Sequence, residues 1–232
     1  MAAVPWWYDY NCNRMNAKIL SRMDWQALIE SQPALATIPA NLRVIADRLE
    51  FETGETLFRL GDRLKGVFCI VSGEVRLIRR ARNGAEIVLQ RARGGFFAEA
   101  SIGTGQYHCD AVTAEPATVL RFPAQAFRAA LASDETFRDA WLAHLAHELL
   151  KSRAQCERLG LKSATRRIVH YIESEGADGM VTLTESRKAW AAELGLTHEA
   201  LYRALRRLQA SGTLNMVANR ITLSHRSNGA RR

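Results

Sequence analysis

Residues 197 to 209 combine one carboxylate with several cationic and hydrogen-bonding side chains. The side chains that could do chemistry here are Thr197, His198, Glu199, Tyr202, Arg203 and Arg206. An arginine can donate two hydrogen bonds to guanine O6 and N7, and a glutamate can accept one from cytosine N4. The pattern is therefore typical of a helix that reads base edges. The alternative is a surface helix of a small bundle, whose charges are merely solvated.

The same stretch is expected to form a helix with one apolar side. Leu201, Leu205 and Leu208 recur at i, i+4 and i+7, so they face a core while the charged side chains face away. Thr197 is the expected N-cap, because its hydroxyl can accept a hydrogen bond from the first helical turn. The helix should end near Gln209.

A shorter helix should precede it. The sequence predicts this helix from about Glu185 to Leu194, with Thr184 as its N-cap. Gly195 follows, at the position where a helix C-terminus favours a residue that tolerates positive φ. Two short helices joined by a glycine turn predict a helix-turn-helix, whose second helix enters the major groove of DNA.

The charge of the chain is concentrated near its C-terminus. The 232 residues carry a formal net charge of +8. Residues 161–232 hold twelve Lys and Arg against six Asp and Glu, so +6 of the +8 lies there. This asymmetry favours a polyanionic partner for the C-terminal region.

Several classes of protein are not indicated. No stretch approaches about 18 consecutive apolar residues, and the first residues lack the pattern of a secretory signal. Four widely spaced cysteines without a CxxC pair argue against a zinc ribbon and a disulfide framework. No nucleophile motif, phosphate loop or metal triad indicates an enzyme. We therefore expect a cytoplasmic protein that is not an enzyme and has no membrane partner.

Short β-rich runs separated by glycine turns fill residues 51–122. Asn83-Gly84 is a strong signal for a two-residue hairpin. Regularly spaced short strands predict an antiparallel barrel or sandwich. Two short helices, Arg22–Ser31 and Ala40–Leu49, are expected before it.

A long helix is expected from Asp134 to about Leu159, capped by Ser133, after a short helix at Ala124–Ala132. Side chains with heptad spacing follow one side of it: Leu142, Leu145, Leu149, Ser152, Cys156 and Leu159. A seam this narrow predicts a parallel homodimer through residues 134–159. The alternative is a seam that packs on the β-rich region of a monomer.

A second mixed region follows the long helix. Ser163 should cap a helix at Ala164–Glu173, and Met180–Leu183 should form a short strand. After the helix-turn-helix, Thr213–Val217 and Arg220–Leu223 predict a hairpin, hence a wing.

With this order of parts, the chain resembles the Crp/Fnr superfamily of bacterial transcription regulators over about residues 25–223. The resemblance rests on the run GETLFRLGD…GVFCIVSGEVRL, the FFAEAS segment, the long helix and the LGLTHEALYRAL motif. It implies an α+β fold with a cyclic-nucleotide-binding-type β-roll (a jelly roll), a long dimerisation helix and a winged helix-turn-helix. The expected division is an N-terminal arm (1–24), a β-roll sensor domain (25–133), a dimerisation helix and hinge (134–160), a DNA-binding domain (161–223) and a basic tail (224–232).

The resemblance also implies which side chains read bases. The family's usual base-reading positions fall on His198, Glu199 and Arg203. Tyr202 stands where relatives often have a small residue, so it could contact a thymine methyl group or alter the half-site. The expected partners are palindromic double-stranded DNA, with G·C pairs in each half-site, and RNA polymerase.

The resemblance does not indicate cyclic AMP as the signal that the β-roll senses. The family positions that bind the ribose and phosphate of a cyclic nucleotide fall on Ala98, Glu99 and Cys109, followed by Asp110. The phosphate-binding arginine is therefore absent, and a carboxylate would repel a phosphate. The N-terminal cysteine cluster of iron–sulfur members is absent as well. We expect neither cyclic AMP nor an iron–sulfur cluster, and the effector stays unidentified.

His108, Cys109 and Asp110 leave alternatives open. Imidazole, thiolate and carboxylate could bind a transition metal or carry a redox-active cysteine. Successive side chains of a strand point to opposite faces, so Cys109 would share its face with Tyr107 and not with His108. A single ion could not easily collect them, so no metal site is assigned. A structural, buried Cys109 is the other interpretation.

Two mechanisms remain possible for the predicted regulator. In the first, a signal in the β-roll shifts the long helices and resets the spacing of the DNA-binding domains, with a hinge near Gly160. In the second, the β-roll has no sensing role and the protein binds DNA constitutively.

Overall fold

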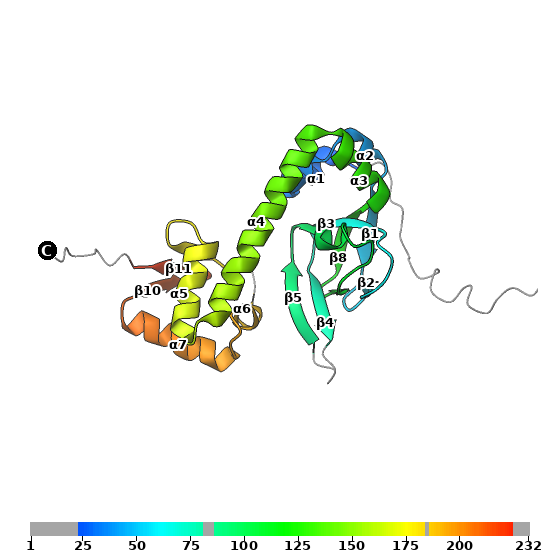
Figure 1. The fold of residues 1–232 in the computed structure, drawn as a ribbon. Coiled ribbons are helices and arrows are strands. Elements are labelled where there is room, and N and C mark those ends of the chain that lie inside the picture. Colours follow the sequence, from blue (N-terminus) through cyan, green and yellow to red (C-terminus); the bar gives the residue numbers. More distant parts are fainter. Residues whose placement is uncertain (1–22, 81–85, 184–185, 225–232) are drawn as a thin grey trace, which may run out of the picture. The chain divides into compact units, whose positions relative to one another are not determined.

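The computed structural model describes residues 23–80, 86–183 and 186–224, and it divides into two compact units between Trp141 and Leu142 (Figure 1). The first unit contains, in chain order, α1 (Trp25–Ser31), the 3-10 helix η1 (Pro33–Thr37), α2 (Ala40–Val44), β1 (Asp47–Phe51), β2 (Thr56–Phe58), β3 (Gly66–Ser72), β4 (Val75–Arg80), β5 (Glu86–Ala92), β6 (Gly95–Phe97), the 3-10 helix η2 (Glu99–Ser101), β7 (Asp110–Thr113), β8 (Ala117–Pro123) and α3 (Ala124–Ser133). The long helix α4 (Glu135–Gly160) begins in this unit and ends in the second.

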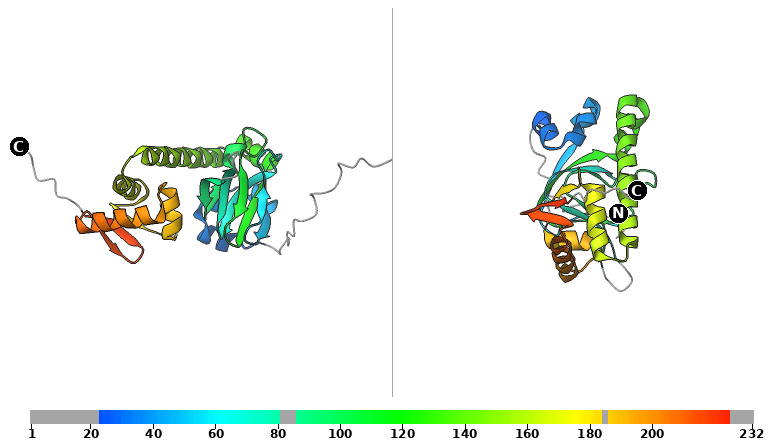
Figure 2. Two further views of the ribbon diagram at one scale, coloured as in Figure 1. Left: turned by 90° about the horizontal axis from the view of Figure 1, so that it is seen from below. Right: turned by 90° about the vertical axis from the view of Figure 1, so that its left-hand side faces the viewer.

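Two antiparallel sheets build the β-roll of the first unit (Figure 2). Their strand orders are β1-β8-β3-β6 and β2-β7-β4-β5. Strands far apart in the chain pair: Leu49 of β1 lies opposite Val119 of β8, and Cys69 of β3 lies opposite Leu120. Buried side chains from both sheets meet in one apolar cluster. The predicted jelly roll is therefore confirmed.

Aromatic rings fill much of the interior of this roll. The Phe58 ring stacks on Tyr107 with centroids 3.7 Å apart, and Phe68 stacks on Phe97 at 5.2 Å. All four side chains are buried. Their large apolar surfaces stabilise the contact between the two sheets.

A second aromatic cluster joins α3 and the first turns of α4 to the roll. Phe127 and Trp141 meet edge to face at 4.8 Å, and Phe96 of β6 lies 5.2 Å from Trp141. The cap of α4 differs from the prediction. Asp134, not Ser133, accepts the hydrogen bond from the Phe137 N–H at 2.9 Å, because its carboxylate directly precedes the first turn.

The prediction of a helix at Ala40–Leu49 was wrong for the second half of this range. Helix α2 ends at Val44, and Asp47 begins strand β1. Pairing with β8 decides this, because Leu49 enters the buried cluster and Asp47 accepts a 2.7 Å hydrogen bond from Arg121. The hairpin signal at Asn83-Gly84 lies outside the described residues, although β4 and β5 on either side of it do pair.

The second unit contains the end of α4, and then α5 (Ala164–Glu175), β9 (Met180–Thr182), α6 (Arg187–Glu193), α7 (His198–Ala210), β10 (Leu214–Val217) and β11 (Arg220–Leu223). The strands form one sheet in the order β10-β11-β9. Ser163 precedes α5, but its hydroxyl bonds to that of Thr165 at 2.7 Å rather than capping a backbone N–H.

The predicted winged helix-turn-helix is present in this unit. Helix α7, orange in Figure 1, lies beside the β10–β11 hairpin. Apolar side chains of α5, α6, α7 and the sheet share a core around Trp190, whose side chain is fully buried. The first helix starts at Arg187 with Ser186 as its cap, later than Glu185; Thr184 and Glu185 lie outside the described residues.

None of the helices in the described ranges is long and apolar enough to cross a lipid bilayer. Within the same ranges, no three His, Cys, Asp or Glu side chains lie close enough together to hold a metal ion.

Candidate nucleic-acid interface

Helix α7 separates a buried apolar side from an exposed polar side. Its buried side chains are Leu201, Ala204, Leu205 and Leu208. All six candidate residues lie on the other side and are exposed: Thr197, His198, Glu199, Tyr202, Arg203 and Arg206. The split follows from the period of the helix, because the leucines are three and four residues apart.

Glu199, Arg203 and Arg206 form the middle of the exposed side. They are four and then three residues apart, so their side chains follow one another along the helix surface. None of them makes a hydrogen bond that would hold its head group against the described part of the protein. A carboxylate and two guanidinium groups are thus presented outward.

The first turn of α7 is held by its cap. The Thr197 hydroxyl accepts a hydrogen bond from the Ala200 N–H at 3.1 Å, which confirms the predicted N-cap. Glu199 lies in this first turn, where the positive end of the helix dipole favours a carboxylate. The cap and the dipole therefore hold the helix end at which base readers are concentrated in helix-turn-helix proteins.

His198 and Tyr202 are brought together on the flank of this side. Their rings meet edge to face, with centroids 4.7 Å apart and planes inclined by 66°. Tyr202 is nevertheless 42% exposed, so the pair still presents an apolar surface outward. An apolar surface beside Arg203 is suited to a thymine methyl group.

The start of α6 is tied to the wing. Arg187 donates from Nη2 to the Ala218 carbonyl oxygen at 3.2 Å, in the turn between β10 and β11. Its guanidinium also lies over the Trp190 ring at 5.6 Å. Lys188 beside it and Arg220 on the wing are exposed. These cations lie on the elements that flank a recognition helix, where phosphate contacts are made.

An apolar row follows the predicted seam of α4. Leu142, Leu149 and Leu159 are 57%, 51% and 45% exposed, and the Cys156 thiol is exposed as well. Leu145 of the same seam is half-buried. Large apolar side chains repeated on one side of a long helix are typical of an interface.

The candidate effector residues lie in the first unit. Ala98 adopts a left-handed conformation with φ of 68°, and it is followed by the half-buried Glu99 in η2. Asp110 does not extend into open space: its carboxylate accepts the Leu60 N–H at 2.7 Å and lies 3.8 Å from Arg80. The carboxylate thus supports the turn after β2.

His108 and Cys109 have different surroundings. The His108 ring is half-buried and lies 3.0 Å from the Ser101 hydroxyl, and burial together with Arg79 lowers its pKa. Cys109 is buried, and burial, with a smaller contribution from Asp110, raises the pKa of its thiol to about 11. The buried thiol and the half-buried imidazole are not arranged as a common ligand set.

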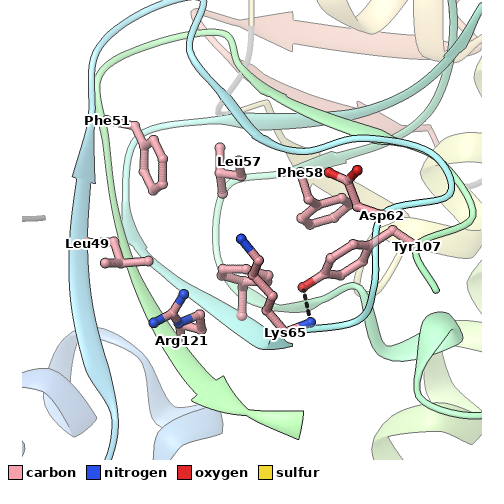
Figure 3. Close-up of a pocket in the computed structure, with 9 residues that line it drawn as sticks. Leu49, Phe51, Leu57, Phe58, Asp62, Lys65, Tyr107 and Arg121 are labelled. Carbon is pink, nitrogen blue, oxygen red and sulfur yellow. Dashed lines mark hydrogen bonds between the residues drawn. The ribbon is translucent and has the colours of Figure 1, made fainter. Parts of the chain in front are cut away.

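A cavity near one end of the roll is lined by Leu49, Phe51, Leu57, Phe58, Asp62, Lys65, Phe68, Tyr107 and Arg121 (Figure 3). Its volume is about 20 Å³, which is room for about one water molecule. The Tyr107 hydroxyl accepts hydrogen bonds from the Lys65 and Gly66 N–H groups, both at 3.2 Å, and helps to close it. None of the four candidate effector residues lines this cavity.

We expect the two buried thiols to be unreactive in the folded protein. Burial raises the pKa of Cys69 to about 12 and that of Cys109 to about 11, so at pH 8 only about one part in a thousand of Cys109 is thiolate. In a Cys12→Ser, Cys156→Ser variant, a thiol-reactive chromogenic disulfide should label neither site until denaturant is added. Fast labelling of one thiol at pH 8, lost in Cys109→Ser, would instead support a redox-active Cys109.

Two arginines that connect helix ends were not identified from the sequence. Arg158, at the end of α4, is 1% exposed and lies 2.7 Å from Glu175. Arg167, on α5, donates to carbonyl oxygens of residues as far away as Gly195. No signal in the sequence distinguishes them, because each directly follows another charged residue, Glu157 or Arg166.

The chain is similar in sequence to known proteins over much of its length. The cyclic nucleotide-binding domain family matches residues 48–134. The chain is 28% identical over 188 residues to the global nitrogen regulator of Synechococcus elongatus, covering 75% of this chain and 84% of that protein. It is 25% identical over 191 residues to the fumarate nitrate reduction regulatory protein of Klebsiella oxytoca, covering 78% of this chain and 76% of that protein.

One solved structure shows how far the fold is shared. FixK2 from Bradyrhizobium japonicum superposes with a TM-score of 0.60 at 24% identity, covering 78% of this chain and 94% of that chain. This likeness concerns the fold alone. It includes both the β-roll and the helices that follow it, because the match extends over most of both chains.

Proposed function

The chain belongs to the Crp/Fnr superfamily of bacterial transcription regulators, and we propose that it acts as a homodimer that reads palindromic DNA with one α7 helix from each subunit. At the coarse level it is a DNA-binding transcription regulator and not an enzyme. The observation that carries the finer proposal is the exposed side of α7, where Glu199, Arg203 and Arg206 stand opposite a fully apolar buried side.

Base reading is assigned to Glu199 and Arg203. Arg203 can donate two hydrogen bonds to one guanine, and Glu199, one turn earlier, can accept from a neighbouring cytosine. Tyr202, packed on His198, would contact a thymine methyl group at the edge of the same half-site. Thr197, Arg206 and the cations of α6 and the wing would bind phosphates and set the position of the helix.

The dimer is assigned to α4. An exposed row of leucines costs free energy in water, and pairing with a second copy would bury it. A two-fold protein also requires a two-fold DNA site, with half-sites about one helical turn apart. From this role in transcription we also expect RNA polymerase as a partner and a cytoplasmic location.

The β-roll is proposed to respond to a signal other than cyclic AMP. The residue at the position that binds the phosphate in the family is Cys109 and not an arginine, which opposes a cyclic nucleotide. A redox or metal response through His108 and Cys109, and constitutive DNA binding, are the alternatives. DNA affinity measured with and without oxidant, transition metals and nucleotides separates them, because a constitutive binder responds to none.

Arg203→Ala is expected to weaken specific DNA binding by about 1–3 kcal/mol, because it removes a bidentate contact to one base. Binding sites selected in vitro from a random pool should lose the preference at one base pair in each half-site. Arg207→Ala, which removes an exposed arginine one turn further along α7, is the matched control. It should weaken all sequences alike and reduce the salt dependence. Equal affinity and equal base preference of Arg203→Ala and wild type would refute this assignment.

A further inference from the structure

We propose that Arg167 is a positioning residue that joins the helix-turn-helix to the end of α4 and thereby sets the spacing of half-sites that the protein accepts. This inference rests on the proposed homodimer. Arg167 does not need to touch DNA. It acts through the backbone that leads into α7.

The Arg167 guanidinium donates to four backbone carbonyl oxygens. Two of them belong to the corner after α4: Nη2 donates to Leu159 at 3.1 Å and Nε donates to Leu161 at 2.7 Å. The other two belong to the turn of the helix-turn-helix: Nη1 donates to Leu194 at 3.1 Å and to Gly195 at 3.0 Å. One planar group therefore bridges two helix ends that are more than 30 residues apart in the chain.

The four acceptors explain why an arginine stands here. The last carbonyl groups of a helix have no partner within that helix and carry partial negative charge. The Leu159 carbonyl lies in the last turn of α4 and the Leu194 carbonyl belongs to the C-cap of α6, while Leu161 and Gly195 directly follow these helix ends. A guanidinium combines its positive charge with several donors in a fixed planar geometry, and a lysine ammonium keeps the charge but cannot reproduce that geometry.

Gly195 brings the two ends into direct contact. Its φ is +62°, and a Cβ added to it would lie 2.8 Å from Leu159 Cδ2 and 3.0 Å from Arg167 Nη1. Thr197, the cap of α7, follows two residues later. The first turn of the proposed recognition helix thus starts from a turn that is packed against α4.

Arg158 anchors the same corner from the other side. Its Nη2 donates to the Ser174 hydroxyl at 3.0 Å and to Glu175 Oε1 at 2.7 Å, which binds the end of α4 to the end of α5. Gly160 lies between Arg158 and the carbonyl of Leu161. Anchors on both sides of Gly160 argue against the hinge predicted there, and favour a corner that moves together with the helix-turn-helix.

The experiment compares Arg167→Gln with Arg166→Gln, the adjacent exposed arginine, as matched control. DNA affinity is measured on a selected palindrome and on versions with one base pair added to or removed from the spacer. Wild type and Arg166→Gln should discriminate equally between spacers. In Arg167→Gln the ratio of the affinities for the selected and the altered spacers should fall about tenfold, because the hydrogen bonds that hold α4 to the turn are gone. Its base preference within each half-site should be unchanged.

The outcomes are distinct. If Arg167 only stabilises the fold, its loss will weaken binding to all spacers alike, and the proposal is overturned; unchanged discrimination in a folded variant overturns it as well. Should Arg167→Gln fail to fold by circular dichroism, Arg167→Lys, which keeps the charge but not the four donors, takes its place with the same readout. Absence of any spacer preference in the wild type would instead count against the homodimer itself.

Discussion

Leu149→Glu is expected to convert the protein to a monomer and to lower its affinity for a palindromic site at least about 100-fold, because two linked half-sites bind far more tightly than one. Leu149 is 51% exposed in the single chain and lies in the middle of the heptad seam of α4. In a parallel dimer it would meet its own copy across the axis. Two carboxylates at that position would be buried side by side without a counter-charge.

Leu150→Glu is the matched control for this prediction. Leu150 is the next residue, is 62% exposed, and lies outside the seam. The same substitution there should leave the dimer and the DNA affinity unchanged. Sedimentation equilibrium gives the mass and a gel-shift titration gives the affinity. A dimeric Leu149→Glu protein would show that the seam is not the interface.

The direction of the two helices can be tested with the exposed cysteine on the same seam. In a parallel pair, Cys156 faces Cys156 of the second copy, so mild oxidation should link the two chains covalently. In an antiparallel pair these thiols would be far apart along the helices. The link should disappear in Cys156→Ser and persist when Cys12 is replaced.

Arg158→Ala is expected to destabilise the second unit by about 3 kcal/mol. The Arg158 side chain is 1% exposed and lies 4.7 Å over the Tyr171 ring. Its removal leaves a cavity and takes the counter-charge from Glu175, which is itself 23% exposed at the side chain. The partial exposure of Glu175 keeps the expected loss at the lower end for a broken buried pair.

Urea unfolding followed by circular dichroism measures this loss. Arg153→Ala, which removes an exposed arginine from the same helix, should change the free energy of unfolding by less than about 0.5 kcal/mol. Arg158→Met keeps much of the side-chain volume and should fall between the two. If Arg158→Ala unfolds at the same urea concentration as Arg153→Ala, the buried pair does not support the unit.

The proposed interface and the end of α4 belong to one compact unit, which gives a physical reason for their coupling. Arg158 and Arg167 bind the last turns of α4 to α5 and to the turn before α7. A signal that displaces the end of α4 would therefore displace α7 with it. A rigid connection transmits motion, whereas a flexible one at Gly160 would absorb it.

Local periodicity determined the parts that the sequence alone could predict. The leucines of α7, the Thr197 cap and the glycine turn before it specify a helix with one polar side, because each depends only on residues within a turn or two. The same holds for the heptads of α4. The residues proposed to meet DNA were therefore identified without a structure.

Only the tertiary structure decided which distant groups meet. Residues 47 to 49 follow a helical pattern but form a strand. They do so because they pair with β8 and because the Leu49 side chain enters the buried cluster of the roll. Asp110 supports a turn begun some 50 residues earlier, and Arg167 joins two helix ends. Such contacts depend on the path of the whole chain. No repeating spacing in the sequence encodes them, since the partners are brought together by packing and not by the geometry of a single helix or strand.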